Sequence, residues 1–393
     1  MAQITIHRGT HQIGGCVTEI SADNARVFID IGDNLPGENH NNSELPPIDG
    51  LTAGSCDNSA LFLTHYHGDH IGLLDRVLSE IPVYMGKTAK AIQLNSAERV
   101  SPNKVSMLEK IQTFAPLDRI KNGDITVTPL MIDHSAFDAY MFLIEVDGTR
   151  ILHTGDFRLH GVRSRKTLKM LDCYAKGIDY IICEGTTLSR NAEPPMSEHE
   201  LRRKAAELME KSPYVFVLCA STNIDRIGAF YHANPKGRLF ICDKYQKKQL
   251  ETVRQAHADK SDFYDFKYVL DYAPNLDKLM EERGFCMLVR QGAFFQRVME
   301  RYKGRSLVIY SMWTGYIDER ALNSGLRDFL SPYPYQVLHT SGHASPNDIK
   351  RLYDSVKPNR GLIPIHTDKP ELFRGLIPDG TIILLDDGEA WQL

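Results

Sequence analysis

The sequence lacks long apolar runs and has little cysteine. The longest apolar runs, such as residues 215–220 and 382–385, are far shorter than the roughly 18 residues that a membrane span requires. The seven cysteines are widely spaced and form no Cys-x-x-Cys pair, which argues against a disulfide framework and a thiolate zinc site. The N-terminal MAQITIHRGT has no basic stretch followed by an apolar one, so no secretory signal is readable. These absences predict a cytoplasmic protein without a membrane span.

A strong net charge is also missing. The chain holds 46 Lys and Arg against 50 Asp and Glu, a formal net charge of −4, so total charge does not predict a nucleic-acid partner. The charge is uneven, however: residues 196–335 carry 22 basic and 18 acidic side chains, and the remainder carries 24 and 32. This asymmetry would suit an anionic substrate. Histidine is the unusual component, because several of the 15 histidines cluster beside aspartate, which points to metal chemistry.

Short segments in which apolar and polar residues alternate predict a strand-rich α/β protein. The predicted strands of the first part lie at residues 3–6, 16–20, 26–31, 60–64, 125–130, 139–146, 150–153 and 180–183. Residues 71–78 have helical periodicity. After a polar stretch at residues 190–195, Ser197 and Glu200 form a capping box that predicts a helix start, and helices then alternate with strands such as 214–218 and 306–310.

Length and these patterns predict two domains. We assign residues 1–195 to the first part of one domain, residues 196–335 to an inserted second domain, and residues 336–393 to the returning part of the first. The returning part has predicted strands at 336–339, 361–365 and 381–385, which we expect to complete the sheet of the first domain.

The strongest motif is His65-Tyr66-His67-Gly68-Asp69-His70, which comes directly after an apolar strand. Imidazoles two residues apart on an extended chain face the same way, and the next turn brings Asp69 and His70 to a second position nearby. This cluster of metal-capable side chains predicts a site for two metal ions.

The motif resembles that of the metallo-β-lactamase fold, an αββα sandwich whose sites hold a pair of zinc ions. The family's remaining ligands match residues in order along the chain: His134 in Asp133-His134-Ser135, Asp156 in Thr154-Gly155-Asp156, and His366 in Ile363-Pro364-Ile365-His366. Taken alone, His134 or His366 would more often be structural, but their order after these strands favours ligands.

The resemblance assigns a role to each of these residues. It implies that His65, His67 and His134 bind one metal, that Asp69, His70 and His366 bind the other, and that Asp156 is shared. Asp30 matches an early family Asp that orients the ligands, and a turn Asp after a strand is an equal alternative.

A second set of residues resembles the β-CASP group, the nucleic-acid-processing members of this fold. Glu184 ends a predicted strand, and His343 lies in Thr340-Ser341-Gly342-His343-Ala344-Ser345. With His366 they resemble the three extra motifs of that group, and the insertion at residues 196–335 matches its α/β cap domain. The segments around Ser221 and His343 look most like ribonuclease J-like nucleases. Because the chain ends 27 residues after His366, we expect a short form without the C-terminal domain of that group.

The resemblance also implies a pocket for a nucleotide 5′-phosphate among Ser221, Asn223, Ser341 and Ser345. Ser345-Pro346 has the residues of a helix N-terminus, which can hold a phosphate. The alternative is that Ser345 only caps the helix and Ser221 only turns the chain. Trp313 and Tyr316 come after a strand and could stack a base, although aromatic residues there are more often part of a core.

Together these residues predict a metal-dependent hydrolase that cleaves RNA by a metal-bridged hydroxide, as a 5′-to-3′ exonuclease, an endonuclease or both. Asp69, Asp156, Glu184 and His343 are the candidate catalytic residues, with His343 as a general acid or phosphate contact. Zn²⁺ is the favoured metal, with Mn²⁺ or Mg²⁺ as alternatives. RNA is favoured over DNA, and a homodimer is an option. The alternatives are a DNA nuclease of the same group, a small-ester lactonase or thioesterase, and a non-catalytic binding subunit.

Overall fold

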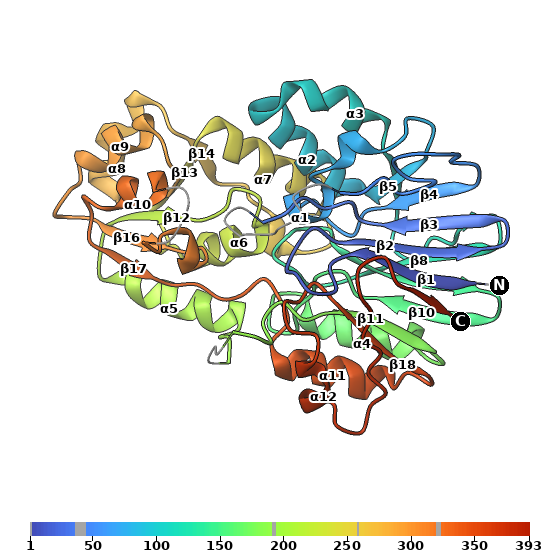
Figure 1. The fold of residues 1–393 in the computed structure, drawn as a ribbon. Coiled ribbons are helices and arrows are strands. Elements are labelled where there is room, and N and C mark those ends of the chain that lie inside the picture. Colours follow the sequence, from blue (N-terminus) through green and yellow to red (C-terminus); the bar gives the residue numbers. More distant parts are fainter. Residues whose placement is uncertain (1, 36–44, 191–193, 258, 320–323) are drawn as a thin grey trace. The chain divides into compact units, whose positions relative to one another are not determined.

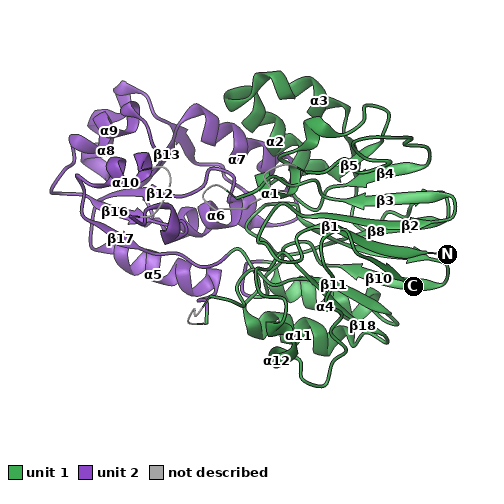
Figure 2. Ribbon diagram, viewed as in Figure 1, with its two compact units in different colours: residues 1–159, 163–194, 342–393 green, residues 160–162, 195–341 purple. Residues whose placement is uncertain are grey.

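The computed structural model describes residues 2–35, 45–190, 194–257, 259–319 and 324–393 (Figure 1). The chain divides into two compact units (Figure 2). Unit 1 comprises residues 1–159, 163–194 and 342–393, and unit 2 comprises residues 160–162 and 195–341. Two segments that are far apart in the sequence therefore build unit 1.

Unit 1 contains two β-sheets that share one core. The first sheet has the order β19-β1-β2-β3-β4-β5-β6, with β1 Gln3–Arg8, β2 Val17–Ala22, β3 Ala25–Ile29, β4 Ser59–Phe62, β5 Val83–Gly86, β6 Gln112–Phe114 and β19 Ala390–Gln392. The second has the order β18-β11-β10-β9-β8-β7, with β7 Ile120–Asn122, β8 Ile125–Met131, β9 Tyr140–Val146, β10 Thr149–His153, β11 Tyr180–Glu184 and β18 Gly361–Ile365. One buried cluster joins Ile4 and Phe62 of the first sheet to Phe142 and Ile182 of the second. The two sheets therefore pack face to face.

Helices cover the outer faces of this pair of sheets. In the second sheet, every other side chain points away from the shared core. One of these, Ile181, packs in a second buried cluster with Leu171, Ile349 and Phe373, which belong to three helices. On the first sheet, one helix packs against β5 and β6. The helices of unit 1 are α1 Gly68–Ile71, α2 Lys87–Val100, α3 Val105–Lys110, α4 Ser164–Tyr174, α11 Pro346–Val356 and α12 Leu372–Leu376, and α2 is the one on the first sheet. The predicted αββα sandwich is confirmed.

Unit 2 is a parallel sheet with its own core. The strand order is β14-β13-β15-β12-β16-β17, and all neighbouring strands pair in parallel. The strands are β12 Tyr214–Leu218, β13 Leu239–Cys242, β14 Val269–Asp271, β15 Phe285–Val289, β16 Leu307–Tyr310 and β17 Tyr335–Val337. The helices are α5 Glu198–Glu210, α6 Ile224–Ala233, α7 Lys244–His257, α8 Asp277–Arg283, α9 Ala293–Glu300 and α10 Gly325–Leu330. Helices α8, α9 and α10 pack on one face of this sheet through Met280, Phe295 and Phe329, as expected for an α/β unit.

The predicted helix starts are confirmed, whereas the predicted helix at residues 71–78 is wrong. Ser197 Oγ accepts the Glu200 N–H at 3.2 Å in a complete capping box at the start of α5. After α1 ends at Ile71, by contrast, the chain forms only a 3₁₀ turn at Leu74–Arg76. The Leu73 N–H donates to the Ile31 carbonyl and the Leu78 N–H donates to the Leu51 carbonyl. These two N–H groups therefore do not form the hydrogen bonds of a helix.

The returning segment also departs from expectation. The strand predicted at residues 336–339 is β17, which pairs with β16 in unit 2 and does not complete the sheet of unit 1. Residues 381–385 form only a single bridge, between Leu362 and Ile382, while β18 joins β11 as predicted. The predicted domain boundaries, after residue 195 and after residue 335, stay a prediction. Within the described residues, no helix is both long and apolar enough to cross a membrane.

Candidate metal centre

The predicted ligands converge because they lie at the ends of strands of unit 1. His65 and His67 come after β4, and Asp69 and His70 lie in the short helix α1. The other predicted ligands lie after strands of the second sheet, His134 after β8, Asp156 after β10 and His366 after β18, and the predicted catalytic residue Glu184 lies at the end of β11. These four strands run in the same direction, so their carboxyl ends meet at one edge of the sheet.

Three imidazoles form the first group of metal-capable side chains: His65, His67 and His134. Their ring centroids are 4.6 to 5.0 Å apart, and His134 Nε2 lies 3.2 Å from His67 Nδ1. Burial lowers the pKa of His67 to about 4 and holds the pKa values of His65 and His134 well below their ordinary range. Neutral imidazoles therefore face one another, and this is the form of histidine that binds metals.

A second group combines two carboxylates and two imidazoles: Asp69, His70, Asp156 and His366. His70 Nε2 lies 3.1 Å from Asp156 Oδ2, and His366 Nε2 lies 3.3 Å from Asp69 Oδ2. Burial alone would raise the pKa of Asp156, but His366, His70 and His343 lower it well below its ordinary value. For His70 the balance is opposite: burial would lower its pKa, but Asp156, Asp30 and Asp69 raise it.

Asp156 lies between the two groups. Its Oδ2 atom is 3.8 Å from His65 Nε2 and 4.0 Å from His134 Nε2, in addition to the contact with His70. Its Oδ1 atom is 3.8 Å from His366 Nε2. This position is the one that a carboxylate shared by two cations would need.

Glu184 and His343 stand beside Asp156 and form a third metal-capable group with it and His366. His343 Nδ1 lies 3.2 Å from Glu184 Oε2 and 3.4 Å from Asp156 Oδ2. Burial would lower the pKa of His343, but the carboxylates of Glu184 and Asp156 raise it above its ordinary value. Glu184 is itself fixed, because its Oε1 accepts the Phe157 N–H at 2.8 Å.

Asp30 contacts two of the predicted ligands, one directly and one through Thr64. Its Oδ2 atom lies 2.7 Å from His70 Nδ1 and accepts the Thr64 hydroxyl at 2.7 Å, while Oδ1 accepts the Thr64 N–H at 2.8 Å. Thr64 Oγ1 is in turn 3.0 Å from His65 Nδ1. One buried carboxylate thus contacts one predicted ligand in each of the first two groups, directly for His70 and through Thr64 for His65.

Sequence reasoning missed several residues that hold the ligands. Thr186 Oγ1 lies 2.7 Å from His366 Nδ1 and 2.6 Å from Glu184 Oε2, and the Gly342 carbonyl lies 2.7 Å from His134 Nδ1. Asp133, directly before His134, and Arg158, two residues after Asp156, form a fully buried ion pair at 2.8 Å. Thr186 and Gly342 lie inside the motifs around Glu184 and His343, but no spacing rule identifies them as orienting groups.

The donor set fits divalent metal ions. His65 Nε2 and Asp156 Oδ1 are buried and have no hydrogen-bond partner among the described residues. Buried polar atoms without partners are costly, so their convergence in one cluster is best explained by coordination. Imidazole nitrogens with carboxylate oxygens suit Zn²⁺ and also Mn²⁺.

The residues of the predicted phosphate pocket have structural contacts. Ser345 Oγ accepts the Asp348 N–H at the start of α11, and Asn223 Oδ1 accepts the Arg226 N–H at the start of α6. Ser221 Oγ lies 3.4 Å from Gln246 Nε2. Ser345 belongs to unit 1, whereas Ser221, Asn223 and Ser341 belong to unit 2. A pocket formed by all four stays a prediction.

Two models of known protein families match parts of this chain. Residues 26–220 match the model of the β-lactamase superfamily domain. The chain contains a metallo-β-lactamase superfamily domain. Residues 335–374 match a second model, described as a Zn-dependent metallo-hydrolase RNA specificity domain. With its histidine and aspartate groups, the metallo-β-lactamase chain is a metal-dependent hydrolase.

The relatives of this metallo-β-lactamase chain include several nucleases. Ribonuclease J of Mycobacterium tuberculosis is 26% identical over 398 residues, which cover 93% of this chain and 68% of the relative. Ribonuclease J of Mycoplasma pneumoniae is 23% identical over 433 residues, 98% of this chain and 73% of the relative. Among solved structures, a protein of unknown function from Enterococcus faecalis has a TM-score of 0.81 at 23% identity and covers 100% of both chains. That likeness supports the fold.

Proposed function

We propose that this metallo-β-lactamase chain is a two-metal phosphodiesterase that hydrolyses RNA. The observation that carries the proposal is the position of Asp156, whose carboxylate lies 3.1 to 4.0 Å from imidazoles of both metal-capable groups. The ribonuclease J relatives and the match to an RNA specificity model support RNA as the polymer.

In this proposal the two groups hold one divalent cation each. His65, His67 and His134 are the ligands of one, and Asp69, His70 and His366 are the ligands of the other, with Asp156 shared. Zn²⁺ is the favoured ion, with Mn²⁺ or Mg²⁺ as alternatives. When bound, such a pair supplies Lewis acidity, which lowers the pKa of water and polarises a phosphoryl oxygen.

His343 is the proposed proton donor to the leaving 3′-oxygen. The Glu184 carboxylate at 3.2 Å orients the His343 ring, and it and Asp156 raise the pKa of His343 despite burial, which favours the protonated imidazole that a proton donor needs. Glu184 is a positioning residue in this scheme, since it acts through His343. The side chain of His343 is 23% exposed, so that a substrate can reach it.

The first test uses purified full-length protein with added Zn²⁺ or Mn²⁺. The substrates are one single-stranded RNA, labelled at the 3′ end, with a 5′-monophosphate or a 5′-hydroxyl, and the matching DNA. Shortening from a 5′-monophosphate RNA end would identify a 5′-to-3′ exonuclease that uses the predicted phosphate pocket. Internal cuts that do not depend on the 5′ group would identify an endonuclease.

Two controls make this test decisive. Asp156→Asn should abolish cleavage, with the far-UV circular dichroism spectrum unchanged, and a chelator should abolish cleavage by the unmodified protein. Cleavage of the DNA alone would favour the DNA nuclease. If neither polymer is cleaved, the proposal is wrong, and a panel of lactone and thioester substrates would test the small-ester alternative.

A further inference from the structure

Unit 2 exposes a cluster of aromatic side chains that the metal centre does not use. Trp313, Tyr316 and Tyr335 are 47%, 53% and 40% exposed. Two of them contact the buried Tyr310: its ring centroid lies 6.1 Å from that of Tyr335, and its hydroxyl donates to the Trp313 carbonyl at 2.8 Å. We call the three exposed residues the aromatic surface. Exposed apolar clusters of this kind mark sites of interaction.

Trp313 packs closely against two neighbours, Tyr316 and Gly315. The rings of Trp313 and Tyr316 meet edge to face, with centroids 5.3 Å apart and planes at 86°. A Cβ atom added at Gly315 would lie 2.3 to 2.5 Å from the six-membered ring of Trp313, so the indole packs directly on that glycine. An indole that is supported from below and still half exposed loses little conformational entropy when a planar ligand stacks on it.

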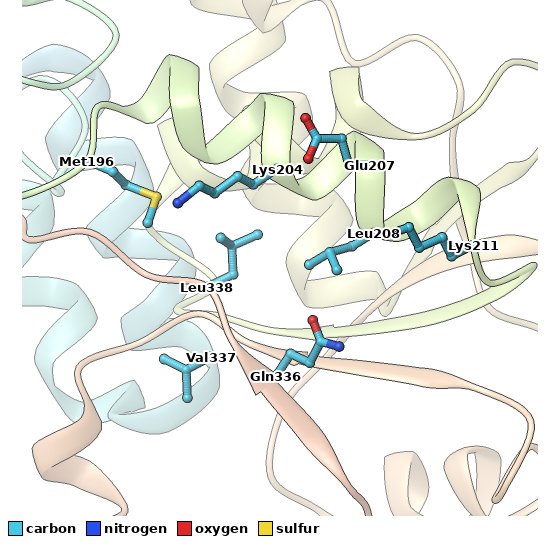
Figure 3. Close-up of a pocket in the computed structure, with 8 residues that line it drawn as sticks. All are labelled: Met196, Lys204, Glu207, Leu208, Lys211, Gln336, Val337 and Leu338. Atoms are coloured by element: carbon cyan, nitrogen blue, oxygen red, sulfur yellow. The ribbon is translucent and has the colours of Figure 1, made fainter.

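A pocket with basic residues is lined in part by β17, the strand that carries Tyr335. It is lined by apolar and charged side chains of α5 and of the segment that includes β17 (Figure 3): Met196, Lys204, Glu207, Leu208, Lys211, Gln336, Val337 and Leu338. Val337 pairs with Tyr310 in the β16–β17 register, so the pocket and the aromatic surface share one edge of the sheet. The acidic member of the lining, Glu207, forms an ion pair with Arg203 at 3.6 Å. Arg203 therefore offsets the negative charge of Glu207.

These features fit one kind of ligand. Flat aromatic faces suit nucleobases, which stack on them with little dependence on sequence, and lysines suit the phosphates between the bases. Residues 196–335, which make up most of unit 2, carry 22 basic and 18 acidic side chains, so the whole unit favours a polyanion.

We propose that the aromatic surface stacks bases of single-stranded RNA while Lys204 and Lys211 contact phosphates of the same strand. The proposal rests on the proposed RNA hydrolase function and adds to it a binding site outside the metal centre. It assigns Trp313 to base stacking and the pocket at β17 to backbone contact.

The chain offers a direct spectroscopic test, because it has only two tryptophans. In a Trp391→Phe background, Trp313 is the one remaining indole. The probe is a phosphorothioate-linked single-stranded RNA, which resists hydrolysis, compared with an abasic strand of the same length. The RNA should quench the fluorescence of Trp313, and the abasic strand should bind without quenching it.

Affinity measurements on variants complete the test. Trp313→Ala should weaken RNA binding by about 5- to 150-fold, and Trp313→Phe should retain part of the affinity. The matched control is Tyr268→Ala, which removes a 78% exposed tyrosine of unit 2 outside the aromatic surface and should change nothing. Replacing Lys204 and Lys211 by alanine should reduce the salt dependence of log K by roughly 0.7 per lysine.

The outcomes separate this proposal from the proposed function. If the protein cleaves RNA but Trp313→Ala binds it as tightly as the unmodified protein, the stacking proposal is overturned and the nuclease function stands. If the protein neither binds nor cleaves RNA, both are overturned. If Trp313→Ala leaves RNA affinity unchanged but dissociates a dimer, the aromatic surface is an interface between copies of the chain.

Discussion

Replacing Asp30 by asparagine tests whether metal binding depends on residues behind the ligands. Asp30 contacts His70 Nδ1 at 2.7 Å and reaches His65 through Thr64, so its charge supports one ligand in each group. Loss of such a support typically weakens metal binding by about 10- to 100-fold, which corresponds to about 1.4 to 2.7 kcal/mol. Because two ligands are affected, we expect the upper part of this range. The dissociation constant for Zn²⁺ can be measured by competition with a chromophoric chelator.

Asp138→Asn is a closely matched control for this variant. Asp30 and Asp138 are both buried and have φ angles of 60° and 61°, which asparagine adopts as readily as aspartate. Asp138 accepts the N–H groups of Thr88 and Ala89 and the Tyr140 hydroxyl, and it contacts no predicted ligand. We expect Asp138→Asn to lower the free energy of unfolding by about 1 to 3 kcal/mol and to leave Zn²⁺ affinity unchanged. Equal Zn²⁺ affinities for the two variants would refute the reasoning.

Three further substitutions test other parts of the site. His343→Ala should reduce kcat for RNA by about 10²- to 10⁴-fold with the metal content unchanged, and a loss of bound metal instead would assign His343 to the ligands. Gly32→Ala should destabilise unit 1 by more than about 3 kcal/mol in urea titrations, because its Cβ would lie 1.6 Å from the Asp69 carbonyl oxygen. Gly68→Ala, whose Cβ meets nothing within 4 Å, is the tolerated control. Arg158→Met should cost about 3 to 5 kcal/mol, since it leaves Asp133 as a buried unpaired charge, and equal thermal stability would contradict this.

The convergence of the predicted ligands could be anticipated from the sequence, in part from local rules and in part from the family resemblance. The two-residue spacing of His65 and His67 needs only an extended chain at the end of a strand, and the chain leaves β4 at Phe62, just before these histidines. His134, Asp156 and His366 each come after an apolar run that is a strand in the structure. Strands that run in one direction bring their carboxyl ends together. Motifs that each follow such a strand are therefore expected to meet at one edge of the sheet.

The other features depend on contacts between residues that are far apart in the sequence, which local patterns do not predict. The contacts of Thr186 with His366 and of Gly342 with His134 join residues 180 and 208 positions apart. The strand at β17 has ordinary strand composition, and only the packing of unit 2 decides that it pairs with β16. Residues 71–78 keep a helical pattern of apolar residues although two of their N–H groups bond to Ile31 and Leu51. In each case tertiary contacts override a local preference.

The composition of the centre itself favours coordination over a purely structural role. Asp156 is buried, and its Oδ1 atom and His65 Nε2 have no hydrogen-bond partner among the described residues. Buried polar atoms without partners are costly. Divalent cations would remove this cost, since they would bind those atoms. Because the predicted ligands lie at the ends of strands from both sheets of unit 1, the same cations would link the two sheets, and metal binding would stabilise this unit.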